Sequence, residues 1–394
     1  MLNRQVWIVI AGMLVLVGAA GIINIFINGE HVMGTSNYVP WGSLIAFYVF
    51  FVATSTGFTF INSLAHVFKV KRFEFLSRRL TLASIAALLM GFVMIGVELG
   101  NPLAMVYIMI SPNFAAPIVW MGLLYGLYLV LHIVEFIFQL KNNHKVIDII
   151  SPIVLAVAIA AQSMLGAVFG MSVARGFWNE AYTSISFIVL AFLSGIAAAV
   201  ILTHILARKN VVGKADKKAI EQLQPVFSKL LLGTVTVVLF FTVWKWIYGL
   251  YGTMPGHADA LQLFAGGPLT APYWLLEIGF VFVVPILLLV FMKKRRDLAL
   301  IFSSLSLMIG IFAMRVMMVF AGQMAPLQVV FGSESAQGIR EVSIFWSEWA
   351  TAGFGIGGVI LIYMIGEKWL DLNTASHDAD VYKQKQETYE FAES

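Results

Sequence analysis

The sequence predicts an all-α integral membrane protein with ten transmembrane helices. Of its 394 residues, 60% are hydrophobic and only 12% are charged, and the mean hydropathy is +0.88, which leaves too little polar surface to cover a water-soluble fold. Ten apolar runs approach or exceed the roughly 20 residues that a helix needs to cross a bilayer. Because these runs are continuously apolar and do not alternate, a transmembrane β-barrel is excluded.

The ten runs are separated by charged segments and by four long, weakly charged segments rich in Gly, Pro and aromatic residues, at residues 28–40, 100–116, 252–272 and 322–346. The first is about 23 residues long and lacks a small-residue cleavage site, so we expect a retained helix and no secretory signal. We expect residues 1–372 to form the membrane domain and residues 373–394 a polar cytoplasmic tail. The runs cover residues 5–27, 41–68, 80–99, 116–140, 149–172, 181–207, 226–252, 273–292, 298–322 and 347–366.

Positive charges occur on alternate loops. Lys and Arg cluster after the second, fourth, sixth and eighth runs, whereas the intervening loops contribute only Arg175 and Arg340. The positive-inside rule therefore places both termini in the cytoplasm. We expect the chain to lie in a prokaryotic cytoplasmic membrane. The formal net charge of +4 follows from this topology and gives no support to nucleic-acid binding.

Two helices share a small-residue motif. Gly57 in the second run and Gly195 in the sixth are each followed by a histidine nine residues later, His66 and His204. This spacing suggests two parallel four-helix bundles, helices 2–5 (41–172) and helices 6–9 (181–322), with helices 1 and 10 peripheral. Alternatively, the small residues simply allow neighbouring helices to approach closely.

Ionisable residues inside the predicted helices form two layers. Charged groups in a bilayer usually face an interior cavity, so each is a candidate functional residue. The outer layer could be a buried ion-pair network or a proton pathway. In the inner layer, His132 and Glu135 lie one helical turn apart and could form a proton relay. Alternatively, the Glu135 carboxylate could snorkel to the cytoplasmic interface. The outer layer contains Glu98, Lys245, Glu277, Arg315 and Glu348, and the inner layer His66, His132, Glu135 and His204.

The cofactors that the chain could hold are restricted by its composition. Cysteine is absent, so the chain cannot bind an iron–sulfur cluster through thiolates. The inner histidines lack the two-layer pairing of a dihaem bundle, and we expect neither haem nor another metal. An apolar, aromatic pocket with a few hydrogen-bonding groups suits a quinone, although Trp41 and Tyr48 could instead anchor the helix at the interface. The candidate quinone ligands are Trp41, Tyr48, Glu98, Asn101, Gln162 and Ser163.

Six segments of the chain carry a family resemblance: Pro40-Trp41-Gly42, Glu98-Leu99-Gly100-Asn101-Pro102, Ser111-Pro112-Asn113-Phe114, Trp120-Met121-Gly122, Gln162-Ser163 and Arg315 to Gln323. Together they resemble the polysulfide reductase NrfD/PsrC family of membrane subunits. The resemblance implies a quinone or menaquinone site in the first bundle near the outer face and no redox metal. It also implies a ferredoxin-like iron–sulfur subunit on the outer face, together with a multihaem cytochrome c and further catalytic subunits, as in the Dsr and Qrc complexes of sulfur metabolism.

The chain departs from this family at four positions. Glu98 stands where the family commonly has Asp, Asn101 where it has Arg, and Ala161 where some relatives have His; Tyr48 replaces a His of the smaller, eight-helix relatives. The proton partner of the quinone is therefore left open by the resemblance.

We expect a quinone-interacting subunit of a respiratory redox complex that is not catalytic in isolation. A secondary transporter and a membrane anchor without a redox site are the alternatives. Electrons would be exchanged with the iron–sulfur partner, and protons would move through some of the buried ionisable groups. The proton-transfer candidates are Glu98, His132, Glu135, Lys245, Glu277 and Arg315.

Overall fold

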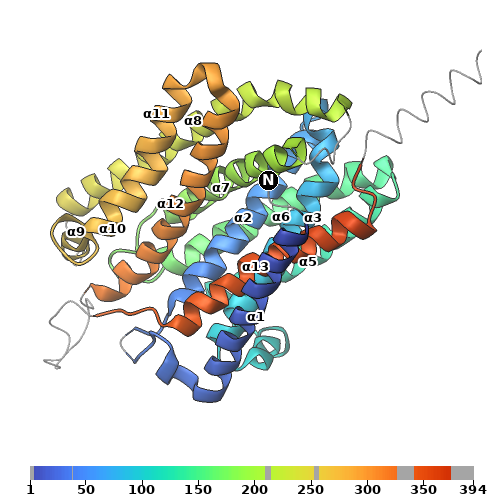
Figure 1. Cartoon of the computed structure of the whole chain (residues 1–394). Helices are drawn as coiled ribbons and strands as arrows, with labels where there is room; N and C mark the ends of the chain where they lie inside the picture. The colour runs from blue at the N-terminus through green and yellow to red at the C-terminus, as the bar shows by residue number, and fades with distance from the viewer. Residues whose placement is uncertain (1–3, 38, 209–213, 253–256, 326–340, 374–394) are drawn as a thin grey trace, which may run out of the picture.

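A computed structural model of the chain describes residues 4–37, 39–208, 214–252, 257–325 and 341–373. Within these ranges, ten helices are long and apolar enough to cross a membrane, and no strand is present (Figure 1). The predicted all-α membrane fold with ten spanning helices is confirmed. Below, "inner" denotes the side of the positively charged loops and "outer" the opposite side.

Eight spans consist of a single α-helix, in two cases with a short 3-10 segment before it. Most of these helices begin and end within four residues of the predicted run. The inner ends carry the basic residues and the outer ends are joined by short helices that do not span. The single-helix spans are α1 (Arg4–Asn28), α2 (Ser43–His66), α3 (Ser77–Glu98), α5 (Pro117–Leu140), α6 (His144–Gly170), α7 (Thr183–Arg208), α12 (Arg296–Met324) and α13 (Trp346–Trp369); the short outer elements are η1 (Gly29–Val32), η3 (Pro102–Val106), α4 (Tyr107–Ile110) and α9 (His257–Ala265), while η2 (Lys71–Leu76) and η5 (Lys293–Arg295) lie on the inner side.

The seventh and eighth spans differ from simple apolar helices. Helix α8 (Lys214–Tyr251) begins 12 residues before the predicted run of 226–252 and continues through Pro225. The prediction missed its first turns because they are polar and hydropathy identifies only apolar segments. The eighth span comprises α10 (Thr270–Pro272), the π-helix η4 (Tyr273–Val283) and α11 (Val284–Phe291). π-Helical geometry is rare and is frequent at functional sites, and Glu277 lies on this segment.

Local sequence explains several helix ends. Pro117 occupies the first turn of α5, where its missing N–H would have no partner in any case. The Asn143 side chain caps α6 by accepting a hydrogen bond from Val146 N at 3.3 Å, which satisfies one of the free N–H groups of that helix.

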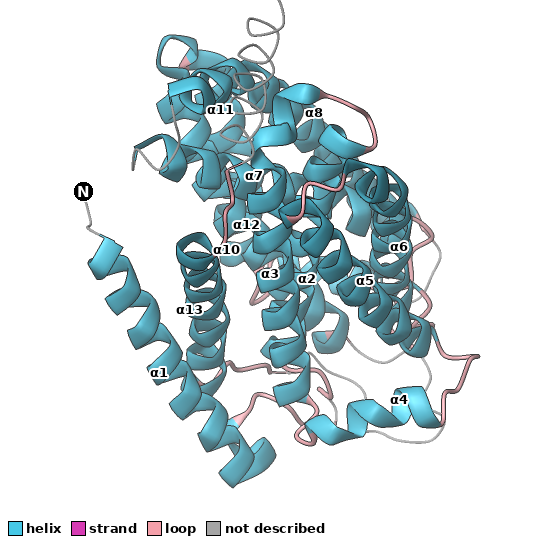
Figure 2. Ribbon diagram, turned by 90° about the vertical axis from the view of Figure 1, so that its right-hand side faces the viewer, coloured by secondary structure: helices cyan, strands magenta, loops and turns pink. Residues whose placement is uncertain are grey.

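Helix α2 lies at the centre of the molecule. It packs against α3, α6, α7 and α12, whereas α1 packs along α13, which in turn packs on α3 (Figure 2). Nearly all of α2 is buried, while α1 exposes large apolar side chains such as Leu16 and Ile27. Since α2 packs broadly along both α3 and α7, the division into two four-helix bundles stays a prediction.

The two glycines of the repeated motif meet where α2 crosses α7. A Cβ on Gly57 would lie 2.1 Å from Ala191 O and 2.6 Å from Gly195 Cα, and a Cβ on Gly195 would lie 2.1 Å from Gly57 C. Only a residue without a side chain permits this approach, and dispersion between the two backbones can then stabilise the crossing. The small residues that suggested a repeat are thus required by packing.

We expect Gly57→Ala to destabilise the protein by about 1–3 kcal/mol, since its methyl group overpacks the crossing. The measurement is the thermal unfolding midpoint of the purified protein in detergent. Gly126→Ala, in α5, is the matched control, because a Cβ there meets nothing within 4 Å and alanine favours a helix. Equal unfolding midpoints for the two variants would contradict the requirement for glycine.

Candidate functional site

The Glu98 carboxyl group lies at the outer end of α2. Its Oε1 accepts a hydrogen bond from Gly42 N at 2.5 Å, at a helix N-terminus whose free N–H groups and dipole favour a carboxylate. Its Oε2 is buried and has no partner among the described residues. One oxygen of Glu98 is therefore held by the backbone and the other remains available to a ligand.

A second carboxyl group, that of Glu348 in α13, converges on the same helix end. Glu348 is fully buried, and its two oxygens accept hydrogen bonds from the Ser43 N–H and hydroxyl and from Gly34 N and Phe345 N. A Cβ on Gly42 would lie 3.1 Å from Glu98 Oε2 and 3.2 Å from Glu348 Oε1. Glu348 thus caps helices and does not join an ion-pair network with Lys245, Glu277 and Arg315. Sequence position could not reveal its contacts with Gly34 and Ser43, because these donors lie more than 300 residues away.

Trp41 is fixed at the start of α2 by contacts with α12 and with the loop after α6. Its backbone N–H donates to Gln323 Oε1 at 2.9 Å and its carbonyl accepts from Gln323 Nε2 at 2.7 Å. Its ring stacks on Trp178 with centroids 5.0 Å apart and meets Phe169 edge-on at 5.2 Å. Trp178 Nε1 donates to Met318 O at 2.8 Å. Trp41 is therefore part of the packed core and does not merely anchor α2 at the interface.

Tyr48 and Gln162 are linked through Tyr125. The rings of Tyr48 and Tyr125 meet edge-on at 6.4 Å, and Tyr125 OH donates to Gln162 Oε1 at 2.8 Å. Gln162 Nε2 donates to Phe187 O at 3.1 Å, so both ends of this amide are satisfied and all three polar side chains are buried. Tyr125 was missed by sequence analysis because a tyrosine in an apolar run gives no signal of its partner.

The other two predicted quinone ligands occupy different surroundings. Ser163 is half-buried and Asn101 is exposed. Asn101 borders a surface hollow formed with apolar residues of η3 and α4. The structure therefore places Trp41, Glu98, Tyr48 and Gln162 in the interior of the outer half of the molecule. Asn101 lies on the same side but at the exposed surface.

His132 and Glu135 form a buried pair in α5. His132 Nδ1 lies 3.0 Å from Glu135 Oε2, and both side chains are at most 1% exposed. Glu135 Oε1 accepts hydrogen bonds from Ser151 Oγ at 2.6 Å and Asn62 Nδ2 at 3.5 Å. Glu135 points inward to these donors, so the alternative of a carboxylate snorkelling to the interface is wrong.

This pair belongs to a longer chain of polar side chains from the middle of α5 to the inner surface. Toward the outer side, the Thr59 hydroxyl lies 3.4 Å from His132 Nε2 and 2.5 Å from Tyr128 OH. Toward the inner side, Asn62 Oδ1 accepts from Ser77 Oγ at 2.7 Å, and Ser77 hydrogen bonds to His66, which borders an inner cavity. The sequence singled out both histidines of this chain but none of the hydroxyl and amide groups that join them.

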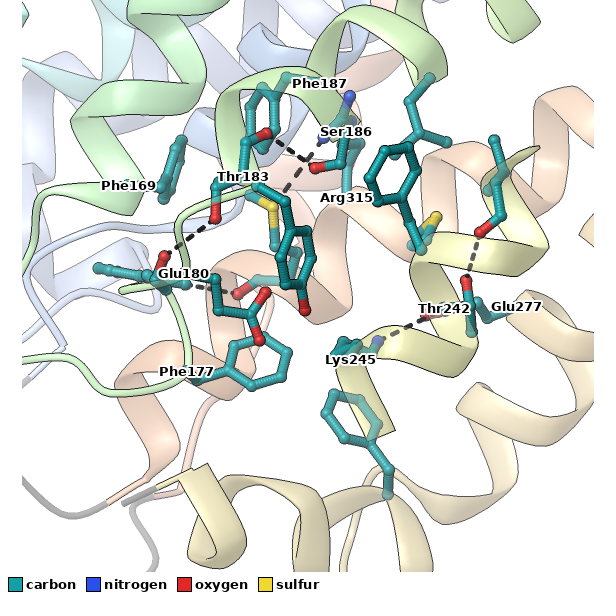
Figure 3. A pocket seen from close by; sticks show the side chains of 18 residues that line it. Phe169, Phe177, Glu180, Thr183, Ser186, Phe187, Thr242, Lys245, Glu277 and Arg315 are labelled. Carbon is teal, nitrogen blue, oxygen red and sulfur yellow. Dashed lines mark hydrogen bonds and ion pairs between the residues drawn. The ribbon is translucent and has the colours of Figure 1, made fainter. Parts of the chain in front are cut away.

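Lys245, Glu277 and Arg315 surround a cavity on the other side of α7 (Figure 3). Lys245 Nζ lies 3.4 Å from Glu277 Oε1 and within 5.1 to 5.7 Å of three aromatic ring centroids. The Arg315 guanidinium stacks on Phe187 at 4.1 Å. The predicted ion pair therefore exists for two of these residues, and Arg315 is not part of it. His204 borders a different, inner cavity.

Glu180, in the loop between α6 and α7, was not identified from the sequence because it lies outside the apolar runs. It borders the same cavity, is 9% exposed, and its Oε1 lies 3.9 Å from His257 Nδ1. Burial raises the pKa of Glu180 to about 7, against the lowering effects of the Tyr182 hydroxyl and the Lys245 ammonium. Burial also lowers the pKa of His257, so both groups favour the neutral form.

The Glu180 carboxyl should make stability depend on pH. Between its ordinary pKa of 4.5 and about 7, the folded chain binds a proton that the unfolded chain releases, so stability falls as the pH rises through this window. We expect Glu180→Gln to remove this loss and to gain up to about 3 kcal/mol over the wild type between about pH 5 and pH 8. Thermal unfolding at both pH values measures the difference. His257 is present in both proteins, so its own titration adds to the pH dependence of both. A stability difference between wild type and Glu180→Gln that does not change with pH would contradict the raised pKa of Glu180.

The described residues contain no group of three His, Cys, Asp or Glu side chains close enough to ligate a metal ion. Two buried groups instead offer hydrogen-bonding atoms to an organic ligand. Glu98 Oε2 and Arg315 Nε and Nη2 have no partner among the described residues, and the Arg315 guanidinium stacks on Phe187.

Comparison with known proteins places this arrangement in a family. The chain shares 22% identity with a selenate reductase subunit of Mesobacillus selenatarsenatis, over 89% of this chain and 90% of the relative. It shares 24% with the Hdr-like menaquinol oxidoreductase integral membrane subunit of Archaeoglobus fulgidus (85% of each chain) and 24% with the membrane subunit of a putative dimethyl sulfoxide reductase of Halobacterium salinarum (95% and 92%). The family described as polysulphide reductase, NrfD, matches residues 31–327. Since the match covers most of the chain, the protein belongs to the NrfD family.

Proposed function

We propose that this protein, a membrane subunit of the oxidoreductase type, exchanges electrons between membrane menaquinone or another quinone and an iron–sulfur subunit on the outer face. The observation that carries the proposal is the Glu98 carboxyl group, with one oxygen held by Gly42 N and the other buried without a partner among the described residues. A relative named as a menaquinol oxidoreductase subunit supports the choice of ligand.

The outer polar groups fit a quinone headgroup chemically. A bound quinone would supply two-electron, two-proton redox chemistry. The chain contains no cysteine, so a cysteine-ligated cluster that exchanges electrons with the quinone would belong to a partner subunit. Glu98 Oε2 can accept a proton from a hydroxyl group or, when protonated, donate to a carbonyl oxygen. The Trp41 and Tyr48 rings offer apolar walls, while the Tyr125–Gln162 hydrogen bond holds the adjacent helices α5 and α6 in place.

The polar chain around His132 and Glu135 is our candidate for proton transfer. It joins hydroxyl, imidazole, carboxyl and amide groups from Tyr128 to His66 with contacts of at most 3.5 Å. An imidazole can both accept and donate a proton through its two ring nitrogens. We infer that protons pass along it between the interior and the inner side, which would couple quinone chemistry to the membrane potential.

The complex to which the protein belongs determines its terminal substrate. The relatives are named for selenate, menaquinol and dimethyl sulfoxide chemistry, so similar membrane subunits serve different catalytic partners. We propose sulfur compounds as the substrate class of the whole complex, with a ferredoxin-like iron–sulfur subunit and a multihaem cytochrome c on the outer face. The transporter alternative predicts substrate flux by the isolated chain.

Glu98→Gln should lower quinol turnover of the assembled complex by about 100-fold, because general acid–base groups contribute about 100- to 10,000-fold. The measurement is oxidation of a menaquinol analogue by the purified complex, with subunit assembly checked on a native gel. Glu341→Gln is the control, since this carboxylate is exposed outside the helices. An assembled Glu98→Gln complex with unaltered turnover would rule out this role.

Glu135→Gln should abolish proton movement linked to quinol oxidation, because the amide cannot release a proton to His132. The measurement uses the complex in liposomes with a pH indicator trapped inside, and quinol oxidation is followed in parallel. The control is Glu221→Gln, an exposed carboxylate on the inner side. If the variant moves protons at the wild-type ratio of protons to electrons, the chain is not the pathway.

A further inference from the structure

The cavity bordered by Lys245 and Arg315 is separate from the Glu98 region. It lies between α7, α8 and α12, on the inner side of the loop after α6, and is a narrow cavity of about 80 Å³. Its border includes none of Trp41, Tyr48, Glu98 or Gln162. The stacked Trp41 and Trp178 rings lie between the two regions.

The Arg315 guanidinium borders this cavity and has N–H groups without hydrogen-bond partners among the described residues. The residue is 1% exposed, and its Nε and Nη2 atoms have no hydrogen-bond partner in the described part of the chain. The Nη1 atom reaches only the Met318 sulfur, at 4.0 Å, among the described contacts. Because an unpaired buried donor costs free energy, a carbonyl or anionic oxygen placed at these N–H groups would stabilise the site.

The other charges of the cavity are already compensated. Lys245 is paired with Glu277 at 3.4 Å, and its ammonium is surrounded by the rings of Phe177, Phe264 and Tyr273. Glu180 lies beside His257 and is held partly protonated near neutral pH by its burial. Arg315 is therefore the cation left to recognise a ligand.

The walls favour a flat aromatic ligand over a hydrated anion. Aromatic side chains from five segments border the cavity, and their rings bind planar groups by stacking, whereas a hydrated anion would lose water against them. The ring residues are Phe169, Phe177, Trp178, Tyr182, Phe187, Phe241 and Phe264. We propose that the cavity binds a second quinone headgroup, whose carbonyl oxygen accepts hydrogen bonds from the Arg315 guanidinium.

Contacts through the protein connect this site to the first one. Gln162, which binds Tyr125, also donates to the carbonyl of Phe187, and the Phe187 ring carries the Arg315 guanidinium. Phe187 therefore contacts both Arg315 of the cavity and Gln162, one of the candidate ligands of the first site. The proposal rests on the proposed quinone function, but it concerns binding and needs no turnover.

The test counts binding sites in the purified intact complex with a fluorescent quinone-site ligand, 2-heptyl-4-hydroxyquinoline N-oxide. We expect two sites per chain in the wild type. Arg315→Met should weaken one of them between about 10- and 100-fold, the loss expected for hydrogen bonds to a charged donor, and Glu98→Gln should weaken the other. Arg208→Met, at the inner end of α7, is the control and should leave both sites unchanged.

A second variant keeps the test independent of the buried charge. Ser186→Phe fills the cavity from α7, where Ser186 bonds only to its own helix, and should remove the Arg315-dependent site while thermal unfolding verifies the fold. One wild-type site that neither variant affects would overturn the proposal but leave the Glu98 function intact. A single site lost in both variants but retained in Glu98→Gln would support the cavity and overturn the Glu98 location. No binding at all would refute both.

Discussion

The rest of the structure depends on the side-chain-free contact between α2 and α7. Gly57 and Gly195 bring the two backbones together, which commits one side of α2 to α7. The residues Ser55, Thr59 and Asn62 repeat at helical spacing and hydrogen bond to α3 and α5 on another side. One tightly packed helix thereby separates the polar chain of the first half from the cavity of the second.

Buried carboxyl groups are tolerated in this protein through three different arrangements. Glu348 accepts hydrogen bonds from three backbone N–H groups and a hydroxyl, Glu135 is paired with an imidazole, and Glu277 with an ammonium. Each compensates the cost of removing a charge from water. Glu98 differs because one of its oxygens lacks a partner, and this difference directs attention to it as a proton-handling group.

The family match ends at residue 327, yet a residue beyond it completes the outer site. Glu348 in α13 holds the N-terminus of α2, and a side chain on Gly42 would meet both Glu348 and Glu98. Helix α13 packs on α3, which carries Glu98, and α1 packs along α13. The tenth spanning helix therefore supports the part of the chain that matches the family and contributes to the surroundings of Glu98.

The sequence by itself determined the ten spans, their predicted orientation and the list of buried ionisable residues, because hydropathy and loop charge are local properties set by transfer into the bilayer. It also identified the His132–Glu135 pair, whose members are one turn apart. Tertiary structure decided which of these groups meet: Glu348 with Ser43, Trp41 with Trp178 and Gln323, and Arg315 with Phe187. Such contacts join segments more than 100 residues apart, and their geometry arises only when the helices pack.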